Sequence, residues 1–432
     1  METILEKIKK ETDFYSLLET SSETINVSFK SNDLHSIENS QNSSFSLKIY
    51  KDKKLASSST NNERYIENLY KDLKEIINIT PEIEYEFNFP KNKILYEPKT
   101  FYPSVIEIKE EKIFELSKYL LESILELDNK LIVDIDVSKS VSKIKIINSE
   151  NIFRQYNKTY FSVSAYAVKT ESDGLLWLGD YSISLDYSEK AANDIINSIK
   201  RQLSWAKNKS NPEKSGKYPV VFSPSVVKFL LETFLLGASA KNHYKKISPL
   251  LDKLDKKIVD EKFSLIDDPF VNGMISTKPF DAEGIACKKV PIIEKGIYKG
   301  IITDIKHSIL LNIEPTGNAS SHSTTPDINF RNIIIPEGEK NLNQIVKDIK
   351  EGIFVESVLG AGQSNMLSGD FAVNVSLGYH IKNGEIVGRV KNLMISGNVY
   401  EIFKEIELSK ETEIKGSLKS PYILFSSVNV NI

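Results

Sequence analysis

Cysteine and histidine are scarce in this sequence. Its 432 residues include one cysteine, Cys287, and five histidines. A single cysteine excludes an intramolecular disulfide and fits a reducing compartment. No histidine lies three to five residues from another, which disfavours a zinc site built from clustered histidines. The histidines are at positions 35, 243, 307, 322 and 380.

A strong charge of one sign and long apolar runs are also missing. The 56 basic and 59 acidic residues leave a net charge of −3, which provides no basic field for nucleic acid. No apolar run reaches the roughly 20 residues that a membrane-spanning helix needs. Residues 1–7 alternate charged and apolar side chains, unlike a secretion signal. We therefore expect a soluble cytoplasmic protein without membrane contacts and without direct nucleic-acid contacts.

The remaining composition is that of an ordinary globular protein. Apolar residues make up 40% and charged residues 27% of the chain, and 432 residues exceed one typical core. Polar segments with proline separate three units, which we place at residues 1–85, 105–206 and 218–432. We predict an α+β protein, with N-terminal α/β units that contain mixed sheets. A mainly antiparallel C-terminal β domain should follow and hold one buried helix.

Hydrophobic periodicity assigns elements to the first two units. A capping box formed by Thr60 and Glu63 should open one of the helices. Apolar residues at helical spacing predict helices at 4–8, 66–77, 113–127 and 191–203. Alternating apolar residues predict half-buried strands at 25–29, 45–49, 131–137, 142–147, 160–169 and 175–186.

Turn signals organise the third unit. Glu294-Lys295-Gly296 and Lys382-Asn383-Gly384 each stand between two apolar runs, which predicts two hairpins. The segment Leu250–Val259 continues a helical pattern. Cys287 lies in an alternating segment and should pack inside a strand. Short helices are expected at 343–350 and 398–405.

An apolar helix is predicted over residues 223–240. Pro224 suits its first helical position, where no amide hydrogen bond is lost. The side chains of Phe229–Leu236 are apolar on nearly all sides except at Glu232, which indicates a helix buried on most faces. A carboxylate in such a place needs a partner, and Lys228 one turn earlier is the simplest one.

Several polar segments are candidates for chemistry, and none forms a convincing active site by itself. The glycine-rich segment 360–365 lacks the Gly-Lys-Ser/Thr of a phosphate loop and suits a turn or the close approach of another backbone. The hydroxyl-rich segment 320–325, which contains His322, has the composition of a solvated loop rather than of a catalytic serine site. The carboxylate pairs in 267–269 and 281–283 suit turns or caps.

A set of short segments within residues 219–428 resembles the TldD/PmbA family. Its members are known as modulators of DNA gyrase and as TldD/TldE metalloproteases. Each segment is weak alone, but their order and spacing are specific. The segments are Pro219–Pro224, Asp267–Pro269, Phe280–Gly284, Thr316–Ala319, Gly369–Phe371, Ile381–Glu385 and Ile395–Asn398.

The resemblance implies one of two kinds of subunit. TldD-type chains carry His-Glu-x-x-x-His on the helix that begins here at Ser223. There, two histidines and a cysteine near the C-terminus bind zinc, and the glutamate acts on the metal-bound water. In this register the chain has Leu231, Glu232 and Leu236, and residues 406–417 contain no cysteine. Because leucine cannot ligate zinc, the chain resembles the PmbA/TldE-type subunit, for which we expect no metal, no other cofactor and no catalytic residue.

The resemblance also implies a function and partners. The chain would be the non-metal-binding subunit of a TldD/TldE-type peptidase that acts on unfolded or peptide substrates. We expect it to pair with a TldD-type zinc subunit and to form a homodimer when alone. Glycine lets another backbone approach closely. The predicted peptide contacts are therefore in the glycine-rich segment, at Gly360, Ala361, Gly362, Gln363 and Asn365.

Two alternatives remain open. One is a self-sufficient, metal-independent hydrolase that uses serine and histidine residues of 320–325. The other is a regulatory protein linked to DNA gyrase. The lack of a basic stripe speaks against direct DNA binding by such a regulator.

Overall fold

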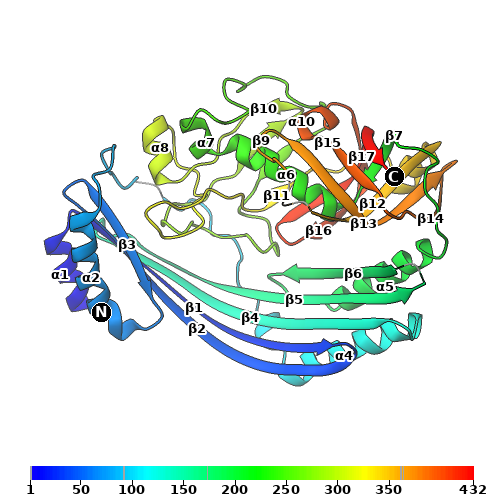
Figure 1. Cartoon of the computed structure of the whole chain (residues 1–432). Coiled ribbons are helices and arrows are strands. Elements are labelled where there is room, and N and C mark those ends of the chain that lie inside the picture. Colours follow the sequence, from blue (N-terminus) through cyan, green and yellow to red (C-terminus); the bar gives the residue numbers. More distant parts are fainter. Residues whose placement is uncertain (1, 91–92, 173, 361, 363) are drawn as a thin grey trace.

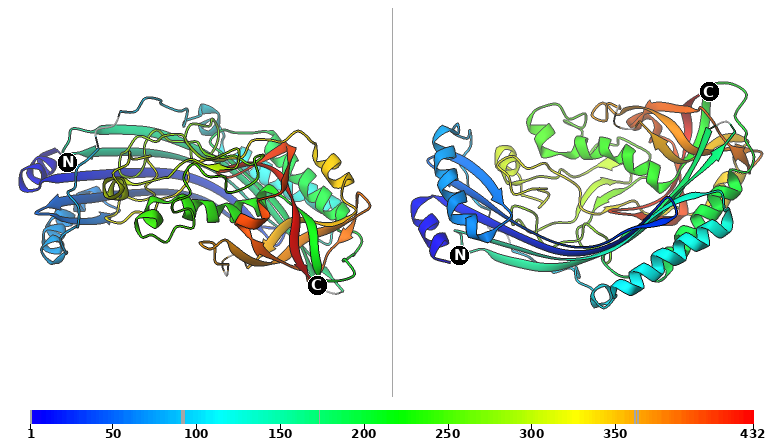
Figure 2. Two further views of the ribbon diagram at one scale, coloured as in Figure 1. Left: turned by 90° about the horizontal axis from the view of Figure 1, so that it is seen from above. Right: turned by 60° about the horizontal axis from the view of Figure 1, so that its bottom comes forward.

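A long curved sheet and a β-rich C-terminal unit make up the molecule (Figure 1). The computed structural model describes residues 2–90, 93–172, 174–360, 362 and 364–432. The C-terminal unit lies on the concave side of the curved sheet, and the helices of the N-terminal half gather at its two ends (Figure 2). We call the curved sheet the arch. The mixed helix and strand content confirms the predicted α+β class.

The arch is one antiparallel sheet with the spatial order β3-β2-β1-β4-β5-β6. β1 pairs with β4 from Ser16 opposite Asn148 to Phe29 opposite Ile135, so the first two units predicted from the sequence share a sheet. Their division into separate domains stays a prediction. The strands are β1 (Phe14–Lys30), β2 (Asp33–Lys51), β3 (Lys54–Thr60), β4 (Ile132–Asn148), β5 (Phe153–Glu171) and β6 (Gly174–Ser184).

The strands of the arch are far longer than the sequence pattern predicts. β1 has 17 residues and β2 has 19, whereas alternation marks only 25–29 and 45–49. Polar residues such as Ser21–Thr24 fill the middle of the sheet, where neither face is deeply buried. Backbone hydrogen bonds to both neighbouring strands hold this stretch of β1 in the sheet.

Helices cover both ends of the arch. α1 (Glu2–Glu11) and α2 (Ile66–Ile79) pack on Leu17 and Leu47, and α4 (Glu110–Leu127) and α5 (Lys190–Trp205) cover the other end. α3 (Pro103–Ile106) is a single turn. Thr60 is not the N-cap, so the predicted capping box of Thr60 and Glu63 does not open this helix. Asn62 accepts from the Arg64 amide and caps a 3-10 turn, η1 (Glu63–Tyr65), that precedes α2.

The C-terminal unit is a mainly antiparallel, closed sheet with the order β10-β9-β8-β11-β17-β15-β13-β12-β7, in which β7 also pairs with β17. β14 and β16 lie beside this path. The strands are β7 (Gly216–Phe222), β8 (Leu265–Asp267), β9 (Val290–Glu294), β10 (Ile297–Tyr298), β11 (Ile333–Ile334), β12 (Glu351–Leu359), β13 (Asp370–Lys382), β14 (Glu385–Arg389), β15 (Met394–Asn398), β16 (Ile406–Lys415) and β17 (Leu418–Asn431). The helices are α6 (Pro224–Ala238), α7 (Ala240–Tyr244), α8 (Ile305–Leu311), α9 (Leu342–Lys347) and α10 (Val399–Ile402).

Two predicted hairpins are confirmed, and two other local predictions are wrong. Lys295 and Gly296 have φ of 47° and 76°, and Asn383 and Gly384 have 52° and 80°, as the tight turns between β9 and β10 and between β13 and β14 require. Residues 250–259 form turns rather than a helix. Cys287 is buried but precedes β9 instead of lying in a strand.

The apolar core of the C-terminal unit surrounds α6. Nine of the fifteen residues of this helix are buried, and they pack with the strands of the closed sheet. Its exposed residues are Ser225, Lys228 and Glu232, which share one face because they are spaced by three and four positions. No described helix has the length and apolar content to span a bilayer.

Candidate functional site

The predicted motif positions lie on two different sides of α6. Leu231 is 1% exposed and packs in the core, and Leu236 packs against the same core while half-buried. Glu232 and Lys228 are both exposed, and in the described residues no ion pair joins them. The expected Lys228 partnership is therefore wrong. A carboxylate on the wet face of α6 is solvated by water and needs no partner.

The wet face of α6 is turned toward the arch. A Cβ added at Gly416, between β16 and β17, would lie 3.7 Å from Lys228 Nζ. The same point is 3.5 Å from Ile275 Cδ1 and 4.0 Å from Ile183 Cγ2 of β6. Lys228 therefore stands where the C-terminal unit meets the edge strand of the arch.

A groove of about 590 Å³ opens beside this meeting point, between β6, α5 and β16. Lys415 Nζ donates to Asp180 Oδ1 across it at 2.5 Å, and Arg201 donates to Glu356 Oε1 at 2.8 Å. In the described sheets β6 pairs only with β5, and residues 412–415 of β16 pair only with β17, so both strands have an unpaired edge beside the groove. Farther along β16, Ser409 and Lys410 bond through their backbones to Gly338 and Lys340. The charged side chains that line the groove are Asp180, Asp194, Arg201, Glu413 and Lys415.

Arg201 of the groove forms an ion pair with Glu356, whose side chain is 13% exposed. Burial raises the pKa of Glu356 to about 7, and the guanidinium of Arg201 opposes that rise. Among the residues that the structure describes, none forms a hydrogen bond with Glu356 Oε2. Tyr422 accepts from Arg201 and donates to Glu413, which links the groove to β17. Arg201 and Lys415 therefore hold neighbouring acidic groups together, and the groove has an excess of acid.

The glycine-rich segment predicted to contact peptide follows β12. Gly360 has φ of +84°, which favours glycine, and it is exposed together with Gly362 and Asn365. Ala361 and Gln363 lie outside the described residues. The base of the segment is joined to α6, because Phe371 contacts Phe229 with ring centroids 5.9 Å apart.

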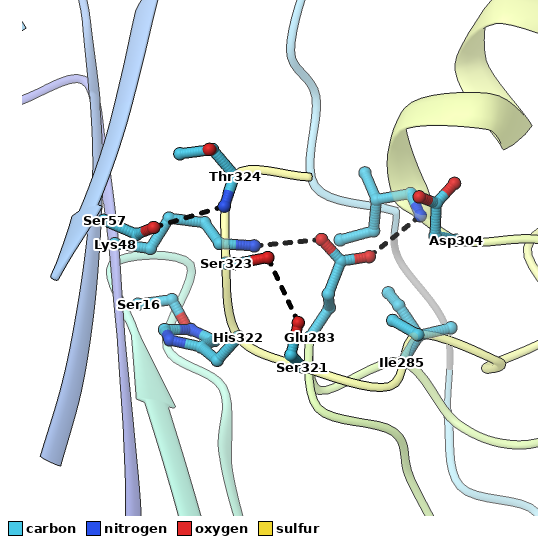
Figure 3. A network of polar contacts seen from close by, with 12 residues as sticks. Ser16, Lys48, Ser57, Glu283, Ile285, Asp304, Ser321, His322, Ser323 and Thr324 are labelled. Carbon is cyan, nitrogen blue, oxygen red and sulfur yellow. Dashed lines mark hydrogen bonds and ion pairs between the residues drawn. The ribbon is translucent and has the colours of Figure 1, made fainter. Parts of the chain in front are cut away.

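A buried polar network joins the C-terminal unit to the arch (Figure 3). Lys48 of β2 donates to Glu283 at 2.9 Å, and their side chains are 4% and 6% exposed. The second carboxylate oxygen of Glu283 accepts from the Ile305 amide at 2.9 Å. Burial raises the pKa of Glu283, and the ammonium of Lys48 opposes the rise. We call this pair the clamp.

His322 strengthens the same junction. Its Nε2 lies 3.0 Å from Ser16 Oγ of β1 (Figure 3). Its Nδ1 lies 3.1 Å from Ser46 Oγ of β2. Burial, reinforced by Lys48, lowers the pKa of His322 well below its usual value. The hydroxyls of Ser321 and Ser323 bond to each other. Both ring nitrogens of His322 are thus engaged with the arch and not with the serines of its own loop.

The carboxylate pairs stabilise loops, as the sequence predicts for turns. Asp281 accepts from the amides of Glu283, Ile285 and Ala319. Asp267 accepts from the Asn318 side-chain amide at 2.7 Å. Among the residues that the structure describes, no three His, Cys, Asp or Glu side chains gather in a way that could hold a metal ion.

Sequence reasoning missed Lys48, Arg201 and Lys415. Lys48 alternates with Leu47 and Ile49 in a strand and therefore has the pattern of a wet face. Arg201 lies on a helix and Lys415 near a turn, where charged residues are usual. The sequence analysis singled out the Asp281–Glu283 pair and the loop of His322, both at the junction with the arch, but neither pattern indicated a partner in β2.

Comparison with protein families matches nearly the whole chain. Residues 15–79 match PmbA/TldA metallopeptidase domain 1, residues 103–206 match the central domain, and residues 215–432 match the C-terminal domain. An uncharacterized protein of Methanocaldococcus jannaschii is 30% identical over 89% of this chain and 88% of its own length. A metalloprotease PmbA homolog of Haemophilus influenzae is 24% identical over 75% of this chain and 71% of its own.

Other relatives and a solved structure agree with this assignment. A zinc metalloprotease TldD homolog of Saccharolobus solfataricus is 31% identical over half of this chain and 48% of its own length. The crystal structure of TldE from Thermococcus kodakarensis superposes with a TM-score of 0.93 over 100% of both chains, at 23% identity, and therefore shares the fold. By the three domain matches and the full-length relative, this chain belongs to the PmbA/TldD family of metallopeptidases.

Proposed function

We propose that this chain is the non-metal-binding, TldE-type subunit of a peptidase complex that acts on unfolded or peptide substrates. The supporting observation is the packing of α6. Leu231 and Leu236 stand where TldD-type chains carry histidines, and both pack on the apolar core. A catalytic zinc needs three nitrogen, sulfur or oxygen ligands that converge. These two side chains offer carbon only.

The role that remains is to shape the place where a peptide is held. The groove has unpaired strand edges on two sides, β6 and β16. An extended peptide can add to such an edge through main-chain hydrogen bonds, which are independent of its sequence. Lys228 lies on the exposed face of α6 close to Gly416, the residue that follows the groove-lining Lys415. An unfolded chain offers free main-chain groups to such an edge, whereas those of a folded domain are mostly paired already.

In this proposal the zinc comes from a partner. A TldD-type subunit would supply the metal-bound water and the glutamate that takes its proton, and this chain would complete the peptide-binding surface. An assembly of this kind should bury more than about 1,000 Å². The chain alone should form a homodimer through the same surface.

The test compares two equivalent glutamates in the mixed complex. Glu232→Gln should leave peptidase activity within a few-fold of wild type, because Glu232 is exposed and has no metal-bound water to activate. The corresponding change in the partner's own motif should abolish activity and serves as the matched control. If Glu232→Gln abolished turnover in a complex that stayed assembled, the assignment would be wrong. Chelator-resistant peptidase activity of the pure chain would support the self-sufficient hydrolase instead.

A further inference from the structure

The outer edge of β6 already holds an amide group. Gln202 of α5 is 1% exposed, and its carboxamide bonds to both backbone groups of Gly179. The Gly179 amide donates to Gln202 Oε1 at 3.0 Å, and Gln202 Nε2 donates to the Gly179 carbonyl at 3.0 Å. A residue of an added antiparallel strand would make the same two hydrogen bonds. The backbone of Gly179 therefore points away from β5, and this edge of the sheet accepts amide groups.

Beyond Gly179, a short part of the edge keeps free backbone groups. Because backbone groups of a strand alternate in direction, those of Tyr181 and Ile183 also point away from β5. The Tyr181 amide donates to Asp180 Oδ1. Among the residues that the structure describes, none bonds to the Tyr181 carbonyl or to the amide and carbonyl of Ile183. Just after β6, the Leu185 amide donates to the Gly273 carbonyl at 2.8 Å, so the free edge has room for only a few residues of another chain.

Three acidic and two basic side chains line the groove beside this edge. The ammonium of Lys415 lies between Asp180 and Glu413, with Nζ–oxygen distances of 2.5 and 3.3 Å. Arg201 pairs at 2.8 Å with Glu356, which is not itself a lining residue. Both cations of the groove are therefore neutralised by carboxylates, and the groove as a whole keeps a negative charge.

Asp194 is the acidic group of the groove that is left over. It is exposed, and in the part of the chain that the structure describes it forms no ion pair. Asp194, Ser198 and Arg201 are spaced by four and three positions, so they share the face of α5 that lines the groove. Leu178 of β6 packs with the core of α5, which shows that alternate side chains of β6 point toward this helix. Alternate side chains of a strand added beside β6 would do the same.

We propose that the groove binds an extended peptide segment and places a lysine or arginine side chain against Asp194. The main chain of the segment bonds to the free groups of Tyr181 and Ile183, as in the addition of a strand to a sheet edge. A long basic side chain on the α5 side then meets a carboxylate without a partner, whereas an acidic side chain meets Asp194 and Glu413 as like charges. This preference rests on the proposed peptide-binding role and narrows the substrate class to unfolded segments that carry a basic residue.

The test measures the binding of short peptides to the full chain alone by calorimetry. The peptides are acetylated and amidated Ser-Val-Xaa-Val-Ser, in which Xaa is lysine, norleucine or glutamate. At about 20 mM salt the lysine peptide should bind about three- to tenfold more tightly than the norleucine peptide, and the glutamate peptide should bind most weakly. Asp194→Asn should reduce the lysine preference to less than about twofold and leave the affinity for the norleucine peptide unchanged. Asp72→Asn is the matched control, since it neutralises an exposed aspartate of α2 at the other end of the arch, and it should change neither.

N-methylation of the lysine peptide separates strand addition from charge attraction alone. A methyl group on an amide that faces β6 removes a donor, so methylation either of the two valine amides or of the central amide should weaken binding at least about tenfold, while the other change should have an effect below about twofold. Equal affinities for the lysine and norleucine peptides, a lysine preference that persists in Asp194→Asn, equal effects of the two methylations, or no binding at about 1 mM would overturn the inference. These measurements use neither the partner nor peptidase activity, so they can fail while the proposed subunit role stands.

Discussion

Removal of one half of the clamp should strongly destabilise the junction between the arch and the C-terminal unit. Lys48→Met keeps the length and methylene groups of the side chain but takes away the ammonium that lies 2.9 Å from Glu283. The carboxylate would stay buried with only the Ile305 amide as a donor. Breaking a buried pair in this way costs about 3–5 kcal/mol, which is a large part of the roughly 5–15 kcal/mol that stabilises a protein.

The loss of stability in Lys48→Met should depend on pH in a defined direction. The folded-state pKa of Glu283 is raised by burial above its usual 4.5, and without Lys48 it rises further. A carboxyl with a raised folded-state pKa contributes its full stability below the unfolded pKa and loses it as pH rises through the folded value. The deficit of Lys48→Met should therefore be largest at neutral pH and should shrink as pH falls toward about 4.5, because protonated Glu283 needs no cation.

The assay is urea unfolding at about pH 7.5 and pH 5.5, with Glu283→Gln and the double variant to complete a cycle. The double variant should be less destabilised than the sum of the single variants. Lys118→Met is the control, since its partner Glu122 and Lys118 itself are about 60% exposed, and it should change stability by less than about 0.5 kcal/mol. A cost of Lys48→Met below about 1 kcal/mol, equal at both pH values, would refute the reasoning.

Three further outcomes are expected. Because burial lowers the folded-state pKa of His322, the unfolded chain binds its proton first as the pH falls, and stability should decrease below about pH 6.5 by about 1.4 kcal/mol per pH unit. His322→Gln should remove this pH dependence from the midpoints of urea unfolding. An unchanged pH dependence would contradict the prediction. Elemental analysis of the untagged chain should find far less than one zinc per chain, and one tightly held zinc that is lost on changing α6 would argue against the subunit assignment. Light scattering should show a homodimer alone and a mixed complex with a co-expressed TldD-type chain; a strict monomer that ignores this partner counts against pairing.

Local elements of the fold could be predicted from the sequence because their cause is local. Gly296, Asn383 and Gly384 adopt positive φ at low cost, so that hairpins form where apolar runs flank these turns. The apolar faces of α2 and α4 recur every three or four residues and require no knowledge of the sheet that they cover. The identities of Leu231 and Leu236, on which the proposed absence of a zinc site rests, are also given by the sequence alone.

The tertiary structure decided what those elements meet. The polar middle of β1 carries no strand signal, yet β2 and β4 hydrogen-bond to its backbone on both sides, and these bonds do not depend on side chains. Lys48 has the alternation of a wet face, and only the position of the C-terminal unit makes it the buried partner of Glu283. Glu232 shows the opposite difference between sequence and structure. Its apolar neighbours along the chain suggest burial, whereas its position on α6 leaves it exposed to water. Alternation and helical spacing report which side of an element differs from the other, whereas contacts between distant segments determine which side is covered.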